Sequence, residues 1–542
     1  MISEPIAADT AYREDARRRR VRCGVILLCA LCALLMAFAP VARAFFHLEA
    51  SYNEGWNVYN AETVATGHLL YRDHYGWTAV NYPMLSFAMT AGLARWTHEF
   101  LFTARMLSLA GLFASCFLMS AIVRRLGGTR FAAAFSGLFC LAMFCAAADY
   151  PSYVGVDDPQ LLAQAFFLAG LYAYLRMKRG WAGLAVAALL FVVGGSIKHN
   201  LIDFPLAVLL DLLLVSRRRA AVFAACGAAF AALSVWMNLR WGGPFFVADL
   251  LSARDYSLGK SLLLTGVNLG PLVFPLVVAF WMAWRVRRDP SRRIVALWLG
   301  CALSLGFYFI GGDGVSINAL YSALLAMSVL VGLLLSALPQ SLVRREAAVA
   351  GMLFAWLLIP WLVVSPLCEG RPALAVWNPV RTLHQFAADE KQFDAEVALL
   401  RAEPGPTLCE SLLRCADAGK PYLYDPFNAT RFIEGGKLDP ERMTAAIRHH
   451  QFSAIQLNGP VNSEDRSSHF APAILEAIRE EYRPVLIHAD DVIYAPVAPV
   501  ATNAELALAK SHCRMRSTNS AGRTDDAARA MWSCATGLTA AP

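Results

Sequence analysis

The chain has 542 residues, of which 57% are hydrophobic and only 16% are charged. Soluble proteins carry about a quarter charged residues, so this composition excludes an ordinary soluble protein and predicts a polytopic membrane protein. The formal net charge is +7, but the arginines stand in short clusters between apolar runs. That placement is typical of cytoplasmic loops. The basic balance therefore does not indicate nucleic-acid binding.

The basic clusters set the expected topology. They lie at 17–22, 124–130, 176–179, 217–219, 285–293 and 344–345. If every cluster faces the cytoplasm, an even number of crossings must separate each neighbouring pair. About eleven apolar segments satisfy this rule, namely 23–44, 100–123, 131–149, 159–177, 181–197, 200–215, 220–239, 262–284, 294–311, 314–337 and 347–366. The sequence thus predicts a polytopic α-helical protein with a cytoplasmic tail at 1–22, a transmembrane domain at 23–366 and everything after residue 367 outside.

One apolar stretch, PMLSFAMTAGLARW at 83–96, does not fit this scheme. If it crossed the membrane, the cluster at 124–130 and every later loop would change sides. We therefore expect it to lie on the outer membrane face or to re-enter it, as an interfacial helix within a long first outer loop at 45–99.

The composition changes at about residue 367. PERMTAAIRHH has the pattern of a helix, and SAIQLN and PVLIHADDVIYAPV have the pattern of strands, so residues 367–500 are expected to form an extracytoplasmic α/β domain. The tail at 501–542 is polar and poor in aromatic residues, which leaves its order open. Disulfides are allowed outside the cytoplasm, and Cys409–Cys415 and Cys513–Cys534 are the candidate pairs.

The first acidic stretch, EASYNEGWNVYNAE at 49–62, directly follows the first crossing. On a helix, Tyr52, Trp56 and Tyr59 form a stripe suited to the membrane interface, while Glu54 points almost opposite. Glu54 is therefore a candidate catalytic carboxylate. Ser51 and Glu54 also have the spacing of a capping box, in which Glu54 bonds to the Ser51 amide. Residue types alone leave these two interpretations about even.

Glu49 comes five residues after the end of the first apolar segment, 23–44. At that place the residue pattern indicates a solvated side chain at the exit of the helix.

The second acidic stretch is GVDDPQLLAQ at 155–164, at the outer start of a predicted crossing. Asp158 followed by Pro159 is a standard pair for the N-cap and first position of a helix. Asp157 is not needed for that cap. Two adjacent carboxylates at the mouth of a membrane helix therefore indicate a functional site.

The third stretch is SIKHNLIDFP at 196–205, which places Lys198 at the outer end of a helix, against the positive-inside bias. The structural interpretation is a lysine that snorkels and complements the helix C-terminus. The functional interpretation is a phosphate contact, with His199 and Asn200 as further donors. Arg72 and Arg254 are other outer-side cations that suit an anionic head group.

These stretches together resemble the GT-C superfamily of membrane glycosyltransferases. The residues that carry the resemblance are NEGWNVYNAETVATGHLLY, NYPMLSF, DDPQLLAQ and KHNLIDFP, all in about the first two hundred residues. The nearest likeness is to bacterial relatives of protein O-mannosyltransferases and to the lipid A aminoarabinose transferase. The resemblance implies a lipid-phosphate-linked sugar donor, chemistry on the outer face, an acidic general base in the first outer loop and a second acid in the next one.

Carried onto this chain, the resemblance makes Glu54 the candidate base and Asp157 or Asp158 the second acid. Many relatives have an Asp-Glu pair in the first loop, whereas Asn53 precedes Glu54 here. Glu49 therefore stays open as the alternative base.

The expected function is transfer of a sugar from a polyprenyl-phosphate-linked donor to a hydroxyl of a lipid, glycan or protein acceptor. It would occur at the outer face of a bacterial inner (cytoplasmic) membrane and invert the anomeric carbon. Lys198 would stabilise the leaving phosphate. No cofactor is demanded, although paired carboxylates are able to hold a divalent metal ion. The alternatives are a lipid or sugar transporter or flippase, against which the lack of internal repeats stands, and a non-catalytic envelope assembly protein.

Overall fold

The computed structural model describes residues 4–177, 180–252, 254–339, 342–363, 378–461, 468–488 and 491–497. The chain divides into two compact units, each described by itself. The first, called the helical unit, comprises Met1–Phe46, Tyr82–Asn238 and Ala253–Ala387, and the second, called the mixed unit, comprises His47–Asn81, Leu239–Ser252 and Ala388–Pro542. The predicted tail at 501–542 and the predicted Cys513–Cys534 pair lie outside the described residues.

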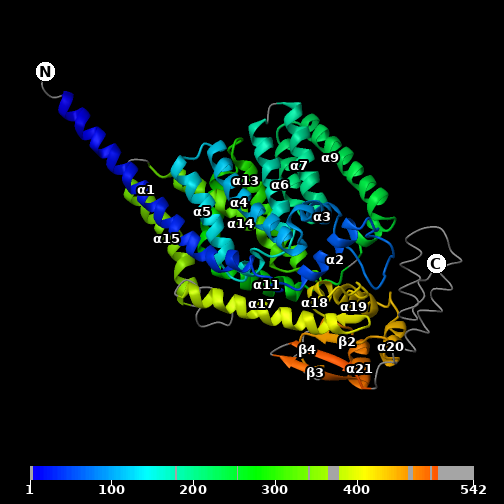
Figure 1. The fold of residues 1–542 in the computed structure, drawn as a ribbon. Coiled ribbons are helices and arrows are strands. Elements are labelled where there is room, and N and C mark those ends of the chain that lie inside the picture. The colour runs from blue at the N-terminus through cyan, green and yellow to red at the C-terminus, as the bar shows by residue number, and fades with distance from the viewer. Residues whose placement is uncertain are drawn as a thin grey trace. The chain divides into compact units, whose positions relative to one another are not determined.

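The helical unit contains most of the helices labelled in Figure 1. They are α1 Glu4–Arg43, α3 Leu85–Thr97, α4 Phe100–Arg125, α5 Arg130–Ala146, η1 Tyr150–Tyr153, α6 Gln160–Arg176, α7 Trp181–Ile197, α8 Asp203–Leu213, α9 Arg217–Met237, α11 Leu258–Leu269, η3 Gly270–Leu272, α12 Val273–Val286, α13 Arg293–Ile310, η4 Ile317–Leu320, α14 Tyr321–Ala337 and α15 Val343–Val363. Helix α17, Pro379–Ala402, continues in sequence into the mixed unit. Each of the eleven predicted apolar segments contains a helix, which confirms a mostly helical fold.

Within the part of the chain that the structure describes, seven helical stretches are long and apolar enough to cross a membrane. They are Ala16–Arg43, Phe100–Arg125, Arg217–Gly242, Leu258–Val286, Arg293–Ile310, Ile317–Ala337 and Val343–Val363. Helices α5 and α7 are apolar but shorter. The count of eleven crossings therefore stays a prediction.

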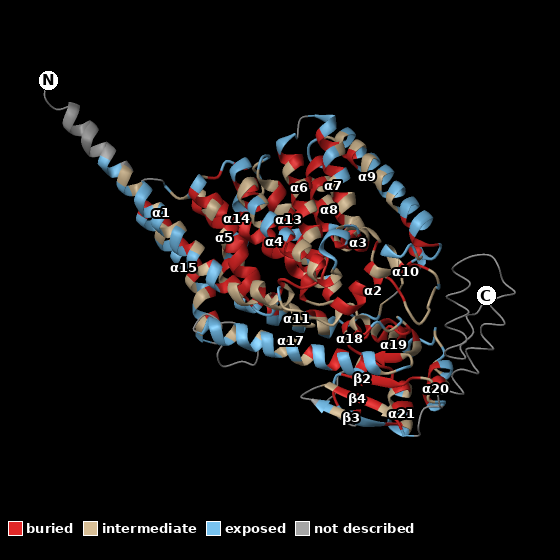
Figure 2. Cartoon of the chain, viewed as in Figure 1, coloured by how far each residue is buried: buried red, intermediate tan, exposed pale blue. Residues whose placement is uncertain are grey.

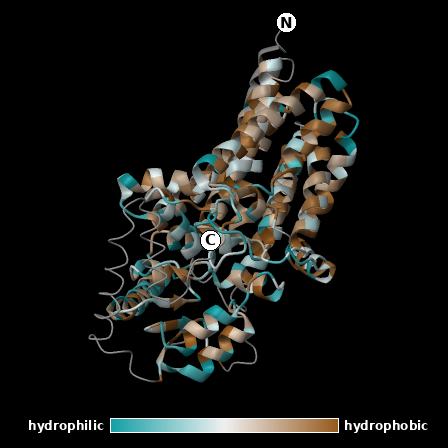
Figure 3. Cartoon of the chain, turned by 90° about the vertical axis from the view of Figure 1, so that its right-hand side faces the viewer, coloured by the Kyte–Doolittle hydropathy of each residue, from teal (hydrophilic) through white to brown (hydrophobic). Residues whose placement is uncertain are grey.

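Burial within the helical unit is strongly graded (Figure 2). In the stretch Ile317–Ala337, which includes α14, 83% of the apolar 18-residue segment is buried, because α5, α12 and α13 pack around it. The stretch that includes α9 has only 11% buried and exposes Leu233 and Trp236. In Figure 3 the long helices are mostly hydrophobic along their length, with hydrophilic residues towards several ends. A helix that exposes large apolar side chains is expected to face lipid.

The predicted interfacial helix at 83–96 is α3. It packs on α4 and α7 and buries Phe87, Ala91 and Ala94 on one side. Trp96, near its end, is exposed. The helix is therefore confirmed, and its place at the outer membrane face stays a prediction.

The mixed unit contains a four-stranded sheet in the order β1-β2-β4-β3. Its strands are β1 Thr407–Cys409, β2 Ala454–Leu457, β3 Tyr482–His488 and β4 Asp491–Pro496, and its helices are α2 Asn53–Ala65, α10 Phe246–Leu250, α18 Leu412–Asp417, α19 Pro426–Glu434, α20 Glu441–Arg448 and α21 Pro472–Glu481. The β1–β2 pair is parallel and the other two pairs are antiparallel. The predicted helix in PERMTAAIRHH and both predicted strand segments are confirmed. The Cys409–Cys415 disulfide is present, with Cα atoms 5.9 Å apart.

Helix α2 is buried on all sides, since every residue from Glu54 to Ala61 is buried. Trp56 Nε1 donates to the Ala79 carbonyl at 3.3 Å. The Tyr59 hydroxyl donates to the Lys420 carbonyl at 2.8 Å, and its ring stacks on Tyr422. The expectation that this aromatic stripe faces lipid is therefore wrong. The pattern marks a face that is removed from water, and here residues far along the chain cover it instead of the bilayer.

Gly55 sets how closely α2 packs against α18. A Cβ atom at Gly55 would lie 1.9 Å from the Leu413 backbone nitrogen and 2.4 Å from the Leu412 carbonyl carbon. Both atoms belong to the backbone, which cannot swing aside as a flexible side chain does. Only glycine fits at this position.

We predict that Gly55→Ala destabilises the protein by about 1–3 kcal/mol or more, because overpacking moves backbone. The melting temperature of the purified protein in detergent measures this effect. Gly92→Ala in α3 is the matched control, since no atom lies within 4 Å of its added Cβ. That control should melt at or slightly above the wild-type temperature, given the better helix propensity of alanine. A wild-type melting temperature for Gly55→Ala would contradict the close packing of α2 on α18.

Candidate active site

In the helical unit, Asp158 and Lys198 form a buried ion pair. Gln160 N donates to Asp158 Oδ1 at 2.7 Å, so the predicted helix cap is present. The second carboxylate oxygen, Oδ2, lies 3.6 Å from Lys198 Nζ. Lys198 follows the last residue of α7 in an extended conformation and is 3% exposed. Its side chain therefore turns inward and does not snorkel to water.

The Lys198 ammonium has few partners for a buried charge. Nζ lies 3.7 Å from the centre of the Tyr82 ring, a cation–π contact. Among the described residues, none accepts a hydrogen bond from Nζ, and none donates one to Asp158 Oδ2. A buried charge without hydrogen bonds is costly. The pair is therefore able to bind a ligand that brings acceptor oxygens to Nζ.

His199 and Asn200 follow Lys198 and are partly buried. Nδ1 of His199 and Oδ1 of Asn200 form no hydrogen bond with described residues. Burial lowers the pKa of His199 to about 3, helped by the charges of Lys198 and Arg254. His199 is therefore neutral at pH 7. Of these three neighbouring residues, only Lys198 brings a positive charge.

The other predicted site residues do not all belong to the same unit as Lys198. Asp157 is buried beside Asp158. Arg254 Nη1 donates to the Asp313 carbonyl at 3.0 Å, also in the helical unit. Arg72 belongs to the mixed unit, where its Nε donates to the Leu69 carbonyl at 2.6 Å.

The sequence did not single out a group of buried amides and hydroxyls near Asp158. Gln160 Nε2 donates to the Asn318 carbonyl at 3.3 Å. Three buried atoms of this group form no hydrogen bond with described residues: Gln160 Oε1, Asn318 Oδ1 and the Tyr321 hydroxyl. The sequence pattern that could have indicated this group is the presence of polar residues at the very start of two apolar helices. This pattern is a weak indication of a site, because polar residues at helix starts also serve as caps.

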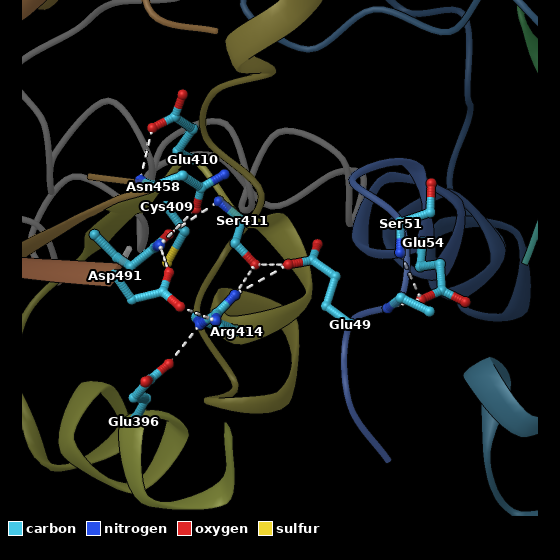
Figure 4. A network of polar contacts seen from close by, with 12 residues as sticks. Glu49, Ser51, Glu54, Glu396, Cys409, Glu410, Ser411, Arg414, Asn458 and Asp491 are labelled. Carbon is cyan, nitrogen blue, oxygen red and sulfur yellow. Dashed lines mark hydrogen bonds and ion pairs between the residues drawn. The ribbon is translucent and has the colours of Figure 1, made fainter. Parts of the chain in front are cut away.

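In the mixed unit, Glu54 is fully buried and holds the start of α2. Its Oε2 accepts from Ala50 N at 2.7 Å and from Ser51 N at 3.3 Å (Figure 4). The glutamate half of the predicted capping box is therefore confirmed. This contact supports the structural interpretation of Glu54.

Glu49 contacts the disulfide-closed loop, Cys409–Cys415, contrary to the expectation of a solvated side chain. Its Oε2 accepts from Arg414 Nη1 at 3.0 Å and from the Ser411 hydroxyl (Figure 4). Its Oε1 is buried and has no hydrogen-bond partner among described residues. Burial raises the pKa of Glu49 to about 7, although Arg414 and Ser411 act in the opposite direction. The expectation was wrong because the partners are more than 360 positions away in the chain.

A metal site of three or more ligands is not formed by the residues that the structure describes, judged from their His, Cys, Asp and Glu side chains.

Comparison with known proteins gives a fold match. No family profile and no curated protein matches the chain. The crystal structure of ArnT from Cupriavidus metallidurans bound to undecaprenyl phosphate is 17% identical and has a TM-score of 0.55, over 88% of this chain and 99% of that one. The apo state of the same ArnT is 15% identical, with the same TM-score and coverage. The chain has the fold of ArnT.

ArnT is the lipid A aminoarabinose transferase, a GT-C enzyme, so the predicted resemblance is confirmed at the level of the fold. The ArnT match reaches far beyond the first two hundred residues that carried the resemblance. The Archaeoglobus fulgidus oligosaccharyltransferase in complex with Zn and sulfate is 12% identical, with a TM-score of 0.46 over 84% of this chain and 71% of that one.

Proposed function

We propose that the chain is a membrane glycosyltransferase that takes a sugar from a polyprenyl-phosphate-linked donor. The observation that carries this proposal is the buried Lys198, whose ammonium has a carboxylate at 3.6 Å but donates no hydrogen bond to a described residue. A phosphate supplies the acceptor oxygens that this ammonium lacks. The ArnT structure of the same fold holds undecaprenyl phosphate.

In the proposed reaction, negative charge develops on the lipid phosphate, which is the leaving group. The bond between the anomeric carbon and the phosphate oxygen breaks, and its electron pair goes to the lipid phosphate. Lys198 is proposed to stabilise this growing negative charge, an effect that is strong in a site without water. Asp158, which accepts a hydrogen bond from Gln160 N, and the Tyr82 ring hold the ammonium in place. Asp157 or Asp158 is the proposed second acid.

The acceptor hydroxyl needs a base, and the geometry of the mixed unit favours Glu49 over Glu54. Glu49 Oε1 has no hydrogen-bond partner among described residues, and a pKa of about 7 suits a general base at neutral pH. Glu54 uses one oxygen for two backbone amides, so protonation would weaken the start of α2. The hydroxyl oxygen would attack the anomeric carbon and invert it, while its proton passes to Glu49.

The proposed location is a bacterial inner membrane, with the N-terminus in the cytoplasm and the mixed unit in the periplasm. The acceptor is proposed to be a hydroxyl of a lipid, glycan or protein.

Lys198→Ala should lower kcat for transfer from a labelled polyprenyl-phosphate sugar by about ten- to a hundredfold, the value of one charged hydrogen bond. Lys198→Arg should keep part of the rate because the charge remains. Steady-state kinetics at varied donor concentration give both constants. Unchanged kcat and KM in Lys198→Ala would exclude the phosphate role, and a wild type inactive with every lipid-phosphate donor would exclude the proposed activity.

Glu49→Gln should lower kcat by about a hundredfold or more, since the amide cannot accept the proton. Glu54→Gln is the matched control, because the Gln oxygen still accepts from the backbone amides and transfer should stay near the wild-type rate. Rates and melting temperatures of both variants are measured together. The reverse pattern, with Glu54→Gln inactive and Glu49→Gln active, would assign the base to Glu54.

Reporter fusions after residues 75 and 430 should both be active on the periplasmic side, because the arginine clusters place both positions outside. A fusion after Ser216, beside the cluster at 217–219, should report the cytoplasm. A cytoplasmic signal at residue 75 or 430 would overturn the proposed orientation.

A further inference from the structure

The disulfide-closed loop Cys409–Cys415 supplies both groups that bind Glu49 Oε2. Ser411 and Arg414 lie within this loop, which runs from the end of β1 into α18. The loop is also anchored to the sheet, since Glu410 N donates to the Gln456 carbonyl and Ser411 N donates to Gln456 Oε1, each at 2.9 Å. Both donors to Glu49 therefore start from a backbone that a covalent bond and two hydrogen bonds fix.

Arg414 is itself held by two further carboxylates. Its Nε donates to Glu396 Oε2 at 2.7 Å and its Nη2 donates to Asp491 Oδ2 at 2.6 Å (Figure 4). Three carboxylates thus surround one guanidinium, on a side chain that is 11% exposed. Three negative charges on one positive charge favour uptake of a proton by one of the three acids.

The second oxygens of the three carboxylates differ, and this difference indicates which acid takes the proton. The second oxygen of Glu396 accepts from Gln392 Nε2 at 2.9 Å, and that of Asp491 accepts from Gln456 Nε2 at 2.9 Å. Both of these second oxygens therefore already accept a hydrogen bond. Glu49 Oε1 has no such donor among described residues. Glu49 is therefore the member of the cluster that binds and releases a proton.

We propose that Arg414 and Ser411, fixed by the Cys409–Cys415 disulfide, are positioning residues that hold Glu49 and set its proton affinity. This rests on the proposed role of Glu49 as the base. The two donors occupy Oε2, so only Oε1 is left to take the acceptor proton. The disulfide loop, which has no catalytic group of its own, thereby controls both the direction of the base and the pH at which it works.

The direction of the pH effect follows from the groups around Glu49. Burial raises its pKa most, Glu54 and Asp491 raise it further, and Arg414 and Ser411 lower it. Glu396 also faces Arg414 from α17. Removal of Arg414 should therefore raise the pKa of Glu49 and move the acid limb of the rate profile to higher pH.

The test compares pH–kcat profiles of Arg414→Gln, Arg414→Lys and Ser411→Ala with that of the wild type. Arg414→Gln should move the acid limb up by about one pH unit, typical for loss of a neighbouring opposite charge. Ser411→Ala should shift it less in the same direction, and Arg414→Lys should restore much of the profile. Arg448→Gln is the matched control, since this exposed arginine of the same unit pairs with Glu480 at 3.9 Å. An unmoved acid limb in Arg414→Gln and Ser411→Ala, with only lower melting temperatures, would reduce the cluster to a structural role.

A second readout does not depend on turnover. The folded-state pKa of Glu49 is raised from 4.5 to about 7, so its stabilising contribution is present below the unfolded value and is lost as pH rises through 7. The melting temperature of the wild type should therefore fall relative to Glu49→Gln between about pH 5 and 8. This fall should move to higher pH when Arg414→Gln is added to both proteins. No difference between these curves would overturn the positioning role, whereas an inactive wild type with the expected curves would overturn only the proposed function.

A separate experiment tests the role of the disulfide. The double variant Cys409→Ser, Cys415→Ser should lower kcat and shift the acid limb as Ser411→Ala does, because both donors then rest on an unclosed loop. Wild-type kcat and pH dependence in this variant would remove the disulfide from the proposal and leave Arg414 and Ser411 in it.

Discussion

A charge that is removed from water must be neutralised or hydrogen-bonded, and in each unit one largely buried cation lies beside a predicted site residue: Arg414 in the mixed unit and Lys198 in the helical unit. Arg414 has three carboxylates, and its Nε, Nη1 and Nη2 all donate. Lys198 has one carboxylate and one aromatic ring, and no described residue accepts a hydrogen bond from it. The first cation is satisfied by the protein, and this suits it to hold other groups in place. The ammonium of Lys198 donates no hydrogen bond to a described residue, and this suits it to bind the oxygens of an anionic ligand.

The same contrast separates the two glutamates of the first loop. Glu54 is satisfied by local backbone amides and is fully buried, so its charge serves the start of α2. Glu49 is held on one oxygen only. A carboxylate that is fixed on one side and unpaired on the other has a defined direction and a raised pKa. These are the two properties that a general base needs.

The features that the sequence predicted correctly are local ones. The cap of Asp158 on Gln160, the glutamate half of the capping box and the Cys409–Cys415 pair all join residues within six positions of each other. Apolar runs likewise predicted where helices form. Contacts between distant segments were not predictable, because Glu49 and Arg414 are 365 positions apart and nothing in either neighbourhood specifies the other. The prediction for the aromatic stripe of α2 was wrong for the same reason. The spacing of the aromatic residues shows that this face is buried, but it does not show which residues or lipids cover the face.

The cysteines divide between the two units in a way that bears on orientation. Among the described residues, the free cysteines Cys23, Cys29, Cys32, Cys116, Cys140, Cys145, Cys226 and Cys301 all belong to the helical unit, where cysteine packs as a small apolar residue. The disulfide belongs to the mixed unit. Structural disulfides persist in oxidising compartments and are rare in the cytosol. The disulfide thus agrees with the proposed periplasmic location of the mixed unit, where the loop that holds Glu49 would close only after export.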